Sequence, residues 1–88
     1  MSNEQKDSLD LNVVARAPFN VYFEGKALSV TATNSVGVFD VLPGHADFFS
    51  ILTPGEINIE TKNEQLTINI NNGIITVTNN NVSLFINM

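Results

Sequence analysis

Apolar and polar residues alternate along most of the chain, and this alternation constrains the fold more than any other feature. In the segment 65–70, for example, Leu66, Ile68 and Ile70 are separated by polar residues. Successive side chains of a β-strand lie on opposite faces, so a segment of this kind buries one face and exposes the other. No stretch shows a helical period longer than about two turns. The sequence therefore predicts an all-β fold.

The alternating segments recur at short intervals, with turn signals between them. The predicted strands cover residues 11–17, 19–25, 27–33, 37–41, 46–52, 56–61, 65–70, 74–78 and 81–87. Pro43-Gly44 and Pro54-Gly55 mark two reversals. Asn72-Gly73 predicts a tight hairpin, because both central residues of a type I′ turn need positive φ. Short strands spaced in this way are typical of a β-sandwich or a small barrel.

Length and composition bound the class of protein. The 88 residues are enough for one domain, which we expect over 9–88 after a flexible polar tail over 1–8. The sequence has no cysteine and no apolar run close to the ~20 residues that span a bilayer, so we expect an intracellular domain without direct membrane insertion. With a net charge of −5 and only four lysines and arginines, the chain is unsuited to binding nucleic acid or acidic lipid.

The residues offer little catalytic chemistry. His45 is the single histidine, and Asp40 and Asp47 are the nearest acids in the sequence. A His-Asp pair could orient an imidazole, but Ser50 lies in a predicted strand and no nucleophile motif accompanies it. One histidine with scattered carboxylates does not make a metal site, and no glycine-rich phosphate loop occurs. We therefore expect no enzyme activity, no metal and no cofactor.

The aromatic residues leave two interpretations open. Phe48 and Phe49 are consecutive, so in a strand one of them faces away from the core. Phe39 and Phe85 raise the same question. Either both faces of a sheet are partly covered and single rings are exposed by chance, or the rings form an apolar patch for a protein partner.

The segment "GVFDVLPGHADFFSILTPGEINI" resembles the hallmark segment of the epsilon subunit of the rotary ATP synthase. The residues that match the family pattern are Gly37, Val41, Leu42, Pro43, Gly44, His45, Ala46, Pro54 and Gly55. The likeness extends over about residues 9–87, from "LNVVARAPFNVYFEG" to "VSLFIN". It implies the family's first domain, a flattened two-sheet β-sandwich of about nine or ten short strands.

The resemblance also implies a role. The family's sandwich is a non-catalytic subunit of the central stalk that contacts the gamma subunit and the membrane c ring, at the membrane periphery and on the cytoplasmic side. By this likeness the ring contact would be the loop Thr33 to Phe39, and Pro43 to His45 would form a tight corner that shapes the surface facing the rotor. The implied partner-binding residues are Val36, Gly37, Val38, Phe39, Asp40, Pro43, Gly44 and His45. We expect the domain to be a monomer in isolation.

The chain departs from the family pattern at informative positions. Asp40 stands where a glycine is usual, Asp47 where a proline is usual, and Val38 where an acid is common. The loss of that acid, together with the gain of Val36 and Val38, would change the expected ring contact from ionic to apolar. Family members usually continue into a two-helix arm, which would begin at about Met88, so the resemblance is to a divergent member without that arm. The alternative function is a free-standing recognition sandwich that binds carbohydrate or another protein, which the asparagine-rich strands would suit.

Overall fold

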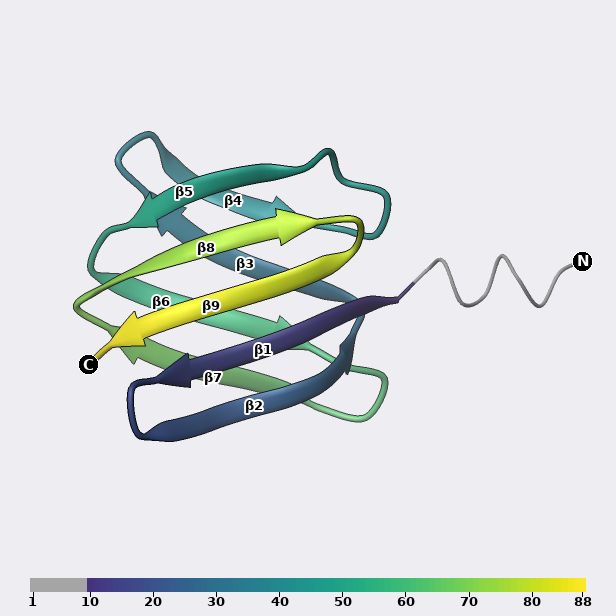
Figure 1. Ribbon diagram of the computed structural model, residues 1–88, viewed down its shortest axis with the longest axis horizontal. Helices are drawn as coiled ribbons and strands as arrows, with labels where there is room; N and C mark the ends of the chain where they lie inside the picture. Colours follow the sequence, from purple (N-terminus) through teal and green to yellow (C-terminus); the bar gives the residue numbers. More distant parts are fainter. Residues whose placement is uncertain (1–9) are drawn as a thin grey trace, which may run out of the picture.

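The computed structural model describes residues 10–88, which form nine strands and contain no helix (Figure 1). The tail expected over 1–8 lies outside the described residues. The strands are β1 (Leu11–Ala17), β2 (Asn20–Ala27), β3 (Ser29–Asn34), β4 (Gly37–Val41), β5 (Phe48–Leu52), β6 (Gly55–Glu60), β7 (Gln65–Ile70), β8 (Asn72–Thr78) and β9 (Asn81–Asn87). The bounds of β1, β4, β7 and β9 are those expected from the alternation, and the other five differ by one or two residues at their ends.

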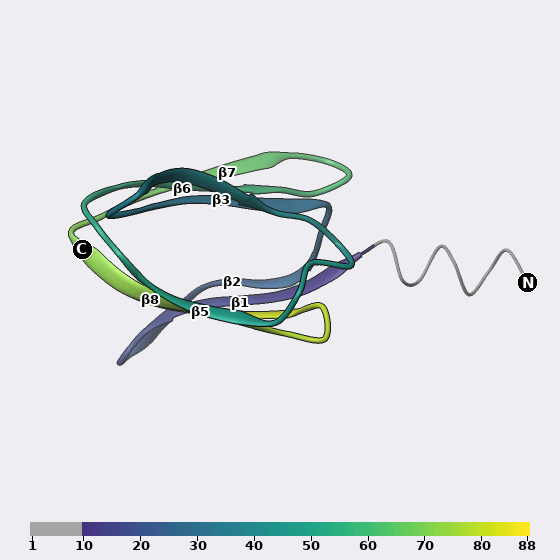
Figure 2. The same cartoon turned by 90° about the horizontal axis from the view of Figure 1, so that it is seen from above.

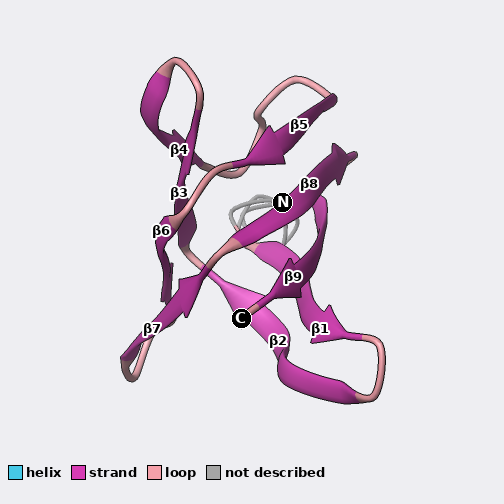
Figure 3. Cartoon of the chain, turned by 90° about the vertical axis from the view of Figure 1, so that its left-hand side faces the viewer, coloured by secondary structure: helices cyan, strands magenta, loops and turns pink. Residues whose placement is uncertain are grey.

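The strands form two sheets that pack face to face (Figure 2). The five-stranded sheet has the order β2-β1-β9-β8-β5, and the four-stranded sheet has the order β4-β3-β6-β7. All neighbours are antiparallel except β1 and β9, which are parallel. The predicted sandwich is confirmed, and the small barrel is excluded because the sheets remain separate along both open sides (Figure 3).

The core lies between the sheets and consists of the inward residues of the alternating segments. The buried apolar residues are Leu11, Val13, Ala15, Ala27, Val30, Ala32, Val41, Leu52, Ile57, Ile59, Ile68, Ile70, Ile75, Val77, Val82, Leu84 and Ile86. No polar or charged residue is buried within 10–88. Each sheet therefore uses period-2 patterning to place one apolar layer inside, and burial of that layer is the main stabilising force.

The hairpin predicted at Asn72-Gly73 is wrong. Both residues belong to β8, and the chain crosses at Asn71 from β7 in one sheet to β8 in the other. Gly73 is needed here for close packing, since a Cβ at this position would lie 2.7 Å from the carbonyl oxygen of Phe85. Local turn propensity thus gives way to the tertiary requirement for a sheet-switching segment.

The tight turn with two left-handed residues occurs instead between β8 and β9. Asn79 and Asn80 have φ values of 52° and 64°, as the two central residues of a type I′ turn require. Asparagine tolerates this conformation better than other residues with a side chain. A tight hairpin turn is therefore present, but it lies at Asn79-Asn80, seven residues after the Asn-Gly pair.

Candidate partner-binding surfaces

The turn between β3 and β4 lies at one end of the sandwich (Figure 1). Val36 belongs to this turn, and Val38 is the second residue of β4. The side-chain oxygen of Asn34 accepts hydrogen bonds from the backbone N–H groups of Val36 (2.9 Å) and Gly37 (3.2 Å). The Asn34 amide also donates to Ser50 Oγ at 3.1 Å, which ties the turn to β5. Val36 is 93% exposed and Val38 is 73% exposed. A locally fixed turn therefore holds apolar side chains in solvent, which suits a protein contact.

Phe39 points to the inner face of β4, whereas Asp40 lies on the same outer face as Val38. The ring of Phe39 packs against the core and meets Phe48 edge to face, with ring centroids 5.7 Å apart. The Asp40 carboxylate accepts a hydrogen bond from Thr31 Oγ1 at 2.6 Å on the outer face of the four-stranded sheet. Of the five residues predicted over 36–40, the structure thus leaves Val36 and Val38 as the apolar contact groups.

Pro43, Gly44 and His45 lie at the opposite end of the sandwich, between β4 and β5. Because β4 runs from the turn that contains Val36 to the corner at Pro43, the structure does not bring this corner together with Val36 and Val38. Gly44 has a φ of 85°, and its N–H donates to the side-chain oxygen of Asn80 at 2.8 Å. This corner is therefore held against the β8–β9 turn.

His45 takes part in the corner through its backbone and its ring. Its N–H donates to the Leu42 carbonyl at 3.0 Å, and its Nδ1 lies 2.7 Å from the Ala46 carbonyl oxygen. The ring also lies 4.9 Å from that of Phe48, centroid to centroid. These contacts fit the structural role expected of His45. Within 10–88, no group of three or more His, Asp and Glu side chains is placed to hold a metal ion.

Asp47 has a role that sequence reasoning missed. Its carboxylate accepts a hydrogen bond from the backbone N–H of Asn79 at 2.8 Å. Together with the bond from Gly44 to Asn80, this contact joins two turns that are more than thirty residues apart in sequence. The sequence shows only that Asp47 is a short polar residue directly before a strand. Its hydrogen-bond partner depends on the order of the strands in the sheet, which cannot be read from local sequence.

A second apolar surface covers part of the outer face of the five-stranded sheet. Cross-strand pairing places Ile51 beside Ile74 and Ile74 beside Phe85. All three side chains are exposed, and Phe49 is exposed on the same face of β5. The row continues to Arg16, whose guanidinium lies 5.9 Å from the centre of the Phe85 ring. We call Phe49, Ile51, Ile74 and Phe85 the apolar row.

The apolar row borders a groove of about 580 Å³. Pro18 of the β1–β2 turn lines it together with Ile51, Ile74 and Phe85. The strands that form its floor are uncharged, since no Asp, Glu, Lys or Arg occurs from Gln65 to Met88. Phe48, by contrast, packs toward the core, so consecutive aromatic residues do face opposite sides as predicted. The grouping of the exposed rings with two isoleucines favours the patch interpretation over chance exposure.

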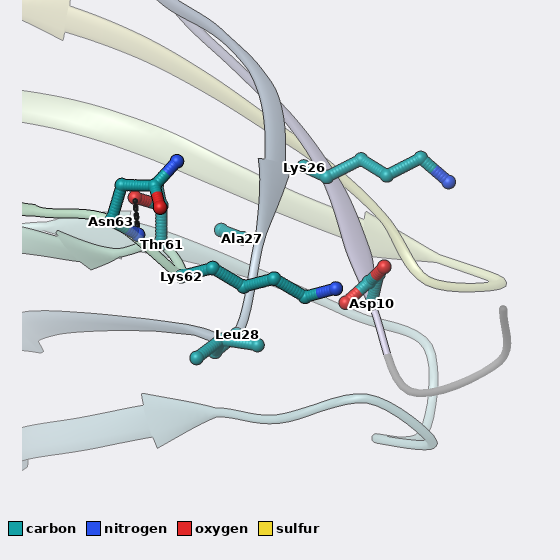
Figure 4. Close-up of a pocket in the computed structure, with 7 residues that line it drawn as sticks. All are labelled: Asp10, Lys26, Ala27, Leu28, Thr61, Lys62 and Asn63. Atoms are coloured by element: carbon teal, nitrogen blue, oxygen red, sulfur yellow. Dashed lines mark hydrogen bonds between the residues drawn. The ribbon is translucent and has the colours of Figure 1, made fainter. Parts of the chain in front are cut away.

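A smaller pocket lies beside the β6–β7 turn and contains two of the four cations (Figure 4). Asp10, Lys26 and Lys62 are among its lining residues. The side chain of Lys62 extends in the direction of Asp10, whereas Lys26 points away from both. Because the ammonium groups diverge, this pocket does not present a focused site for an anion.

The fold is a two-sheet β-sandwich domain with exposed apolar side chains at one end and on one outer face. The chain belongs to the ATP synthase delta/epsilon chain family, whose β-sandwich domain model matches residues 8–87. This finding confirms the resemblance drawn from the segment around Pro43. The described part of the chain consists of strands and turns and contains no helix that could span a membrane.

Relatives and solved structures agree with this membership. The chain is 42% identical over 66 residues to the ATP synthase epsilon chain of Nitratiruptor sp., covering 72% of this chain and 50% of the relative. It is 35% identical over 74 residues to that of Helicobacter pylori, covering 84% and 60%. The chain thus spans about half the length of these curated relatives.

Two solved structures share the fold. One chain of the Euglena gracilis mitochondrial ATP synthase aligns with a TM-score of 0.83 at 17% identity, over 89% of this chain and 51% of its own length. A chain of the Tetrahymena thermophila mitochondrial ATP synthase central stalk and c ring aligns with a TM-score of 0.76 at 20% identity, over 89% and 63%. At these identities the likeness shows the shared sandwich.

Proposed function

We propose that this domain is a non-catalytic subunit of the central stalk of a rotary ATP synthase, where it links the gamma subunit to the membrane c ring. Its place would be at the membrane periphery, as part of that complex. Membership of the family and the names of the relatives support this assignment. The observation that carries it is the exposure of Val36 and Val38 in the segment that the resemblance implies as the ring contact.

The contact with the ring would be made by Val36 and Val38. Apolar burial depends little on ionic strength, whereas an ionic contact is weakened as the Debye length falls from about 10 Å at 0.1 M to about 3 Å at 1 M salt. The hydrogen bonds from Val36 and Gly37 to Asn34 support the assignment, because they fix the turn before the partner arrives. Less conformational entropy is then lost on binding.

The contact with gamma would be made by the apolar row. The groove beside it offers a concave apolar floor, and the uncharged strands β8 and β9 keep the net charge of −5 away from the contact. Aromatic side chains such as Phe85 are typical anchors of protein interfaces. The Arg16 guanidinium over that ring adds a polar rim to the contact.

Site-directed cross-linking tests the assignment. In the assembled complex, a cysteine at Val38 should cross-link to the polar loops of the c ring, and one at Asn80, at the opposite end, should not. Cross-linking from Asn80 but not Val38 would reverse the orientation of the domain. If neither position finds the ring, and the domain does not co-purify with gamma, the rotor assignment fails and a recognition module takes its place.

A further inference from the structure

The outer edge of β7 is the least protected sheet edge within residues 10–88. The edge strand β2 carries Glu24 and Lys26 and faces a β-bulge between Ala15 and Arg16 of β1. The edge strands β4 and β5 have five residues each, and β5 is tied to the β3–β4 turn by the Asn34 side chain. By contrast, β7 pairs with β6 in continuous register over six residues and contains no charge, no proline and no bulge. Such an edge is able to pair with another strand.

The register shows which backbone groups of β7 are available. Thr61 N–H donates to the Glu64 carbonyl across the β6–β7 turn, so the next pair, Glu60 and Gln65, points its hydrogen-bonding groups away from the hairpin. The Glu60 carbonyl agrees with this, since it accepts from Leu28 N–H on the far side. Because the pattern alternates, the N–H and C=O groups of Gln65, Thr67 and Asn69 face the open edge.

The core is also least covered at this edge. Ile68 and Ile70 are 8% and 6% exposed, whereas every other core residue is 3% exposed or less. Leu66, on the same inner face, is only half-buried. The four-stranded sheet has one strand fewer than the sheet packed against it, and β7 is its last strand on this side (Figure 3). An added strand would cover these three side chains.

Charge decides what kind of strand fits. Glu56 pairs with Asn69 and Glu60 pairs with Gln65, and both carboxylates lie on the outer face next to β7. Glu64 adds a third acid in the β6–β7 turn. A second copy of this chain would add two more such acids to the same outer face, which is unfavourable. Lysine or arginine on an added strand would lie on that face about 10 Å from β6, a distance that the long side chains can span.

We propose that the β7 edge binds an extended basic segment of a second polypeptide by strand addition. Apolar residues at every second position of that segment would cover Leu66, Ile68 and Ile70, and the alternate lysines or arginines would approach Glu56 and Glu60. Main-chain hydrogen bonds would supply the affinity, and the alternation would supply the selectivity. This site is separate from the surfaces assigned to gamma and the ring, so the proposal of strand addition at β7 can be tested independently of the proposed stalk function.

A peptide of eight residues that alternates valine with lysine, capped at both ends, tests the proposal on the whole chain. Its binding should slow the hydrogen exchange of the Gln65, Thr67 and Asn69 amides, as followed by NMR. The affinity should fall at least about tenfold between 0.1 and 1 M salt, as the Debye length shortens from about 10 Å to 3 Å. A peptide with glutamate in place of lysine should not bind.

Two variants of Thr67 distinguish the contribution of its backbone N–H to peptide binding from that of its side chain. Thr67→Pro removes the N–H that faces the edge, and proline is tolerated on edge strands whose N–H points to solvent. Thr67→Val keeps that N–H, and both variants lose the hydroxyl bond from Thr67 to Asn58. The peptide should bind the valine variant and fail to bind the proline variant. If Thr67→Pro does not fold, the pair Glu56→Gln and Glu60→Gln serves instead, and should weaken binding with the fold intact.

Three results would overturn the proposal. The first is protection that appears on the apolar row while β7 is unchanged. The second is equal binding of the glutamate peptide. The third is a concentration-dependent dimer in which the Thr67 amide is protected without any peptide, because the occupant would then be a second copy.

Discussion

The two sheets present the same kind of inner face and opposite kinds of outer face. Inside, each contributes one layer of Val, Leu and Ile to a common core. Outside, strands β5, β8 and β9 carry the apolar row and no charge, whereas the four-stranded sheet carries Asp40, Glu56 and Glu60. Folding requires only the inner layers, so the outer faces are free to differ. The proposed contacts with other subunits depend on this difference between the outer faces.

Consecutive residues of β8 give the largest expected contrast between the two faces. Ile75 is fully buried, and Ile75→Ala should lower the free energy of unfolding by about 2–5 kcal/mol through lost burial and a residual cavity. Ile74 is exposed on the apolar row, and Ile74→Ala should cost about 1 kcal/mol or less. Urea unfolding of both variants measures this contrast. Equal losses would mean that the apolar row belongs to the folding core.

The link between the sheets at Gly73 should give the next largest effect. A methyl group there would meet the Phe85 carbonyl oxygen at 2.7 Å, so Gly73→Ala forces β8 and β9 apart. Overpacking of this kind costs about 1–3 kcal/mol. Thermal unfolding followed by circular dichroism measures it, with Gly25→Ala as the control, because the nearest atom to a Cβ there is 3.6 Å away on a side chain. A Gly73→Ala variant as stable as that control would show that the close approach is not required.

The corner at His45 is another of the connections between the sheets and should give the smallest effect. His45→Gln removes the bond from the ring to the Ala46 carbonyl and the contact with Phe48. His45 itself is exposed, so the expected loss is about 0.5–1.5 kcal/mol, the range for one hydrogen bond. Chemical denaturation of the variant provides the measurement. A global loss of structure would give His45 a larger role than its contacts suggest.

The inner layers and the outer features differ in how far the sequence predicts them. Alternation along residues 65–70 or 81–87 fixes which side chains point inward, because the period of a strand is a local property. Sheet order is not local, and this is why Asn72-Gly73 was assigned to a hairpin although it begins a strand in the other sheet.

The same limit applies to the candidate sites. The family pattern marked Val36 and Val38, which the structure leaves exposed, but it grouped them with Pro43, Gly44 and His45 at the other end. The apolar row was visible only as single exposed aromatic residues, since Ile51, Ile74 and Phe85 come from three strands that pair in the folded state. The open edge of β7 required the strand order of both sheets.

The affinity of the domain for gamma tests the central contrast between the two outer faces most directly. Phe85→Asp places a charge in the middle of the apolar row, and Glu56→Lys changes the charge of the opposite face; circular dichroism should first show that both variants keep the β-sheet spectrum. We predict that Phe85→Asp weakens binding to purified gamma by at least about thirtyfold, the loss expected for an interface anchor worth 2 kcal/mol, and that Glu56→Lys leaves it nearly unchanged. Unchanged binding by Phe85→Asp together with a large loss for Glu56→Lys would contradict the account and move the gamma contact to the four-stranded sheet.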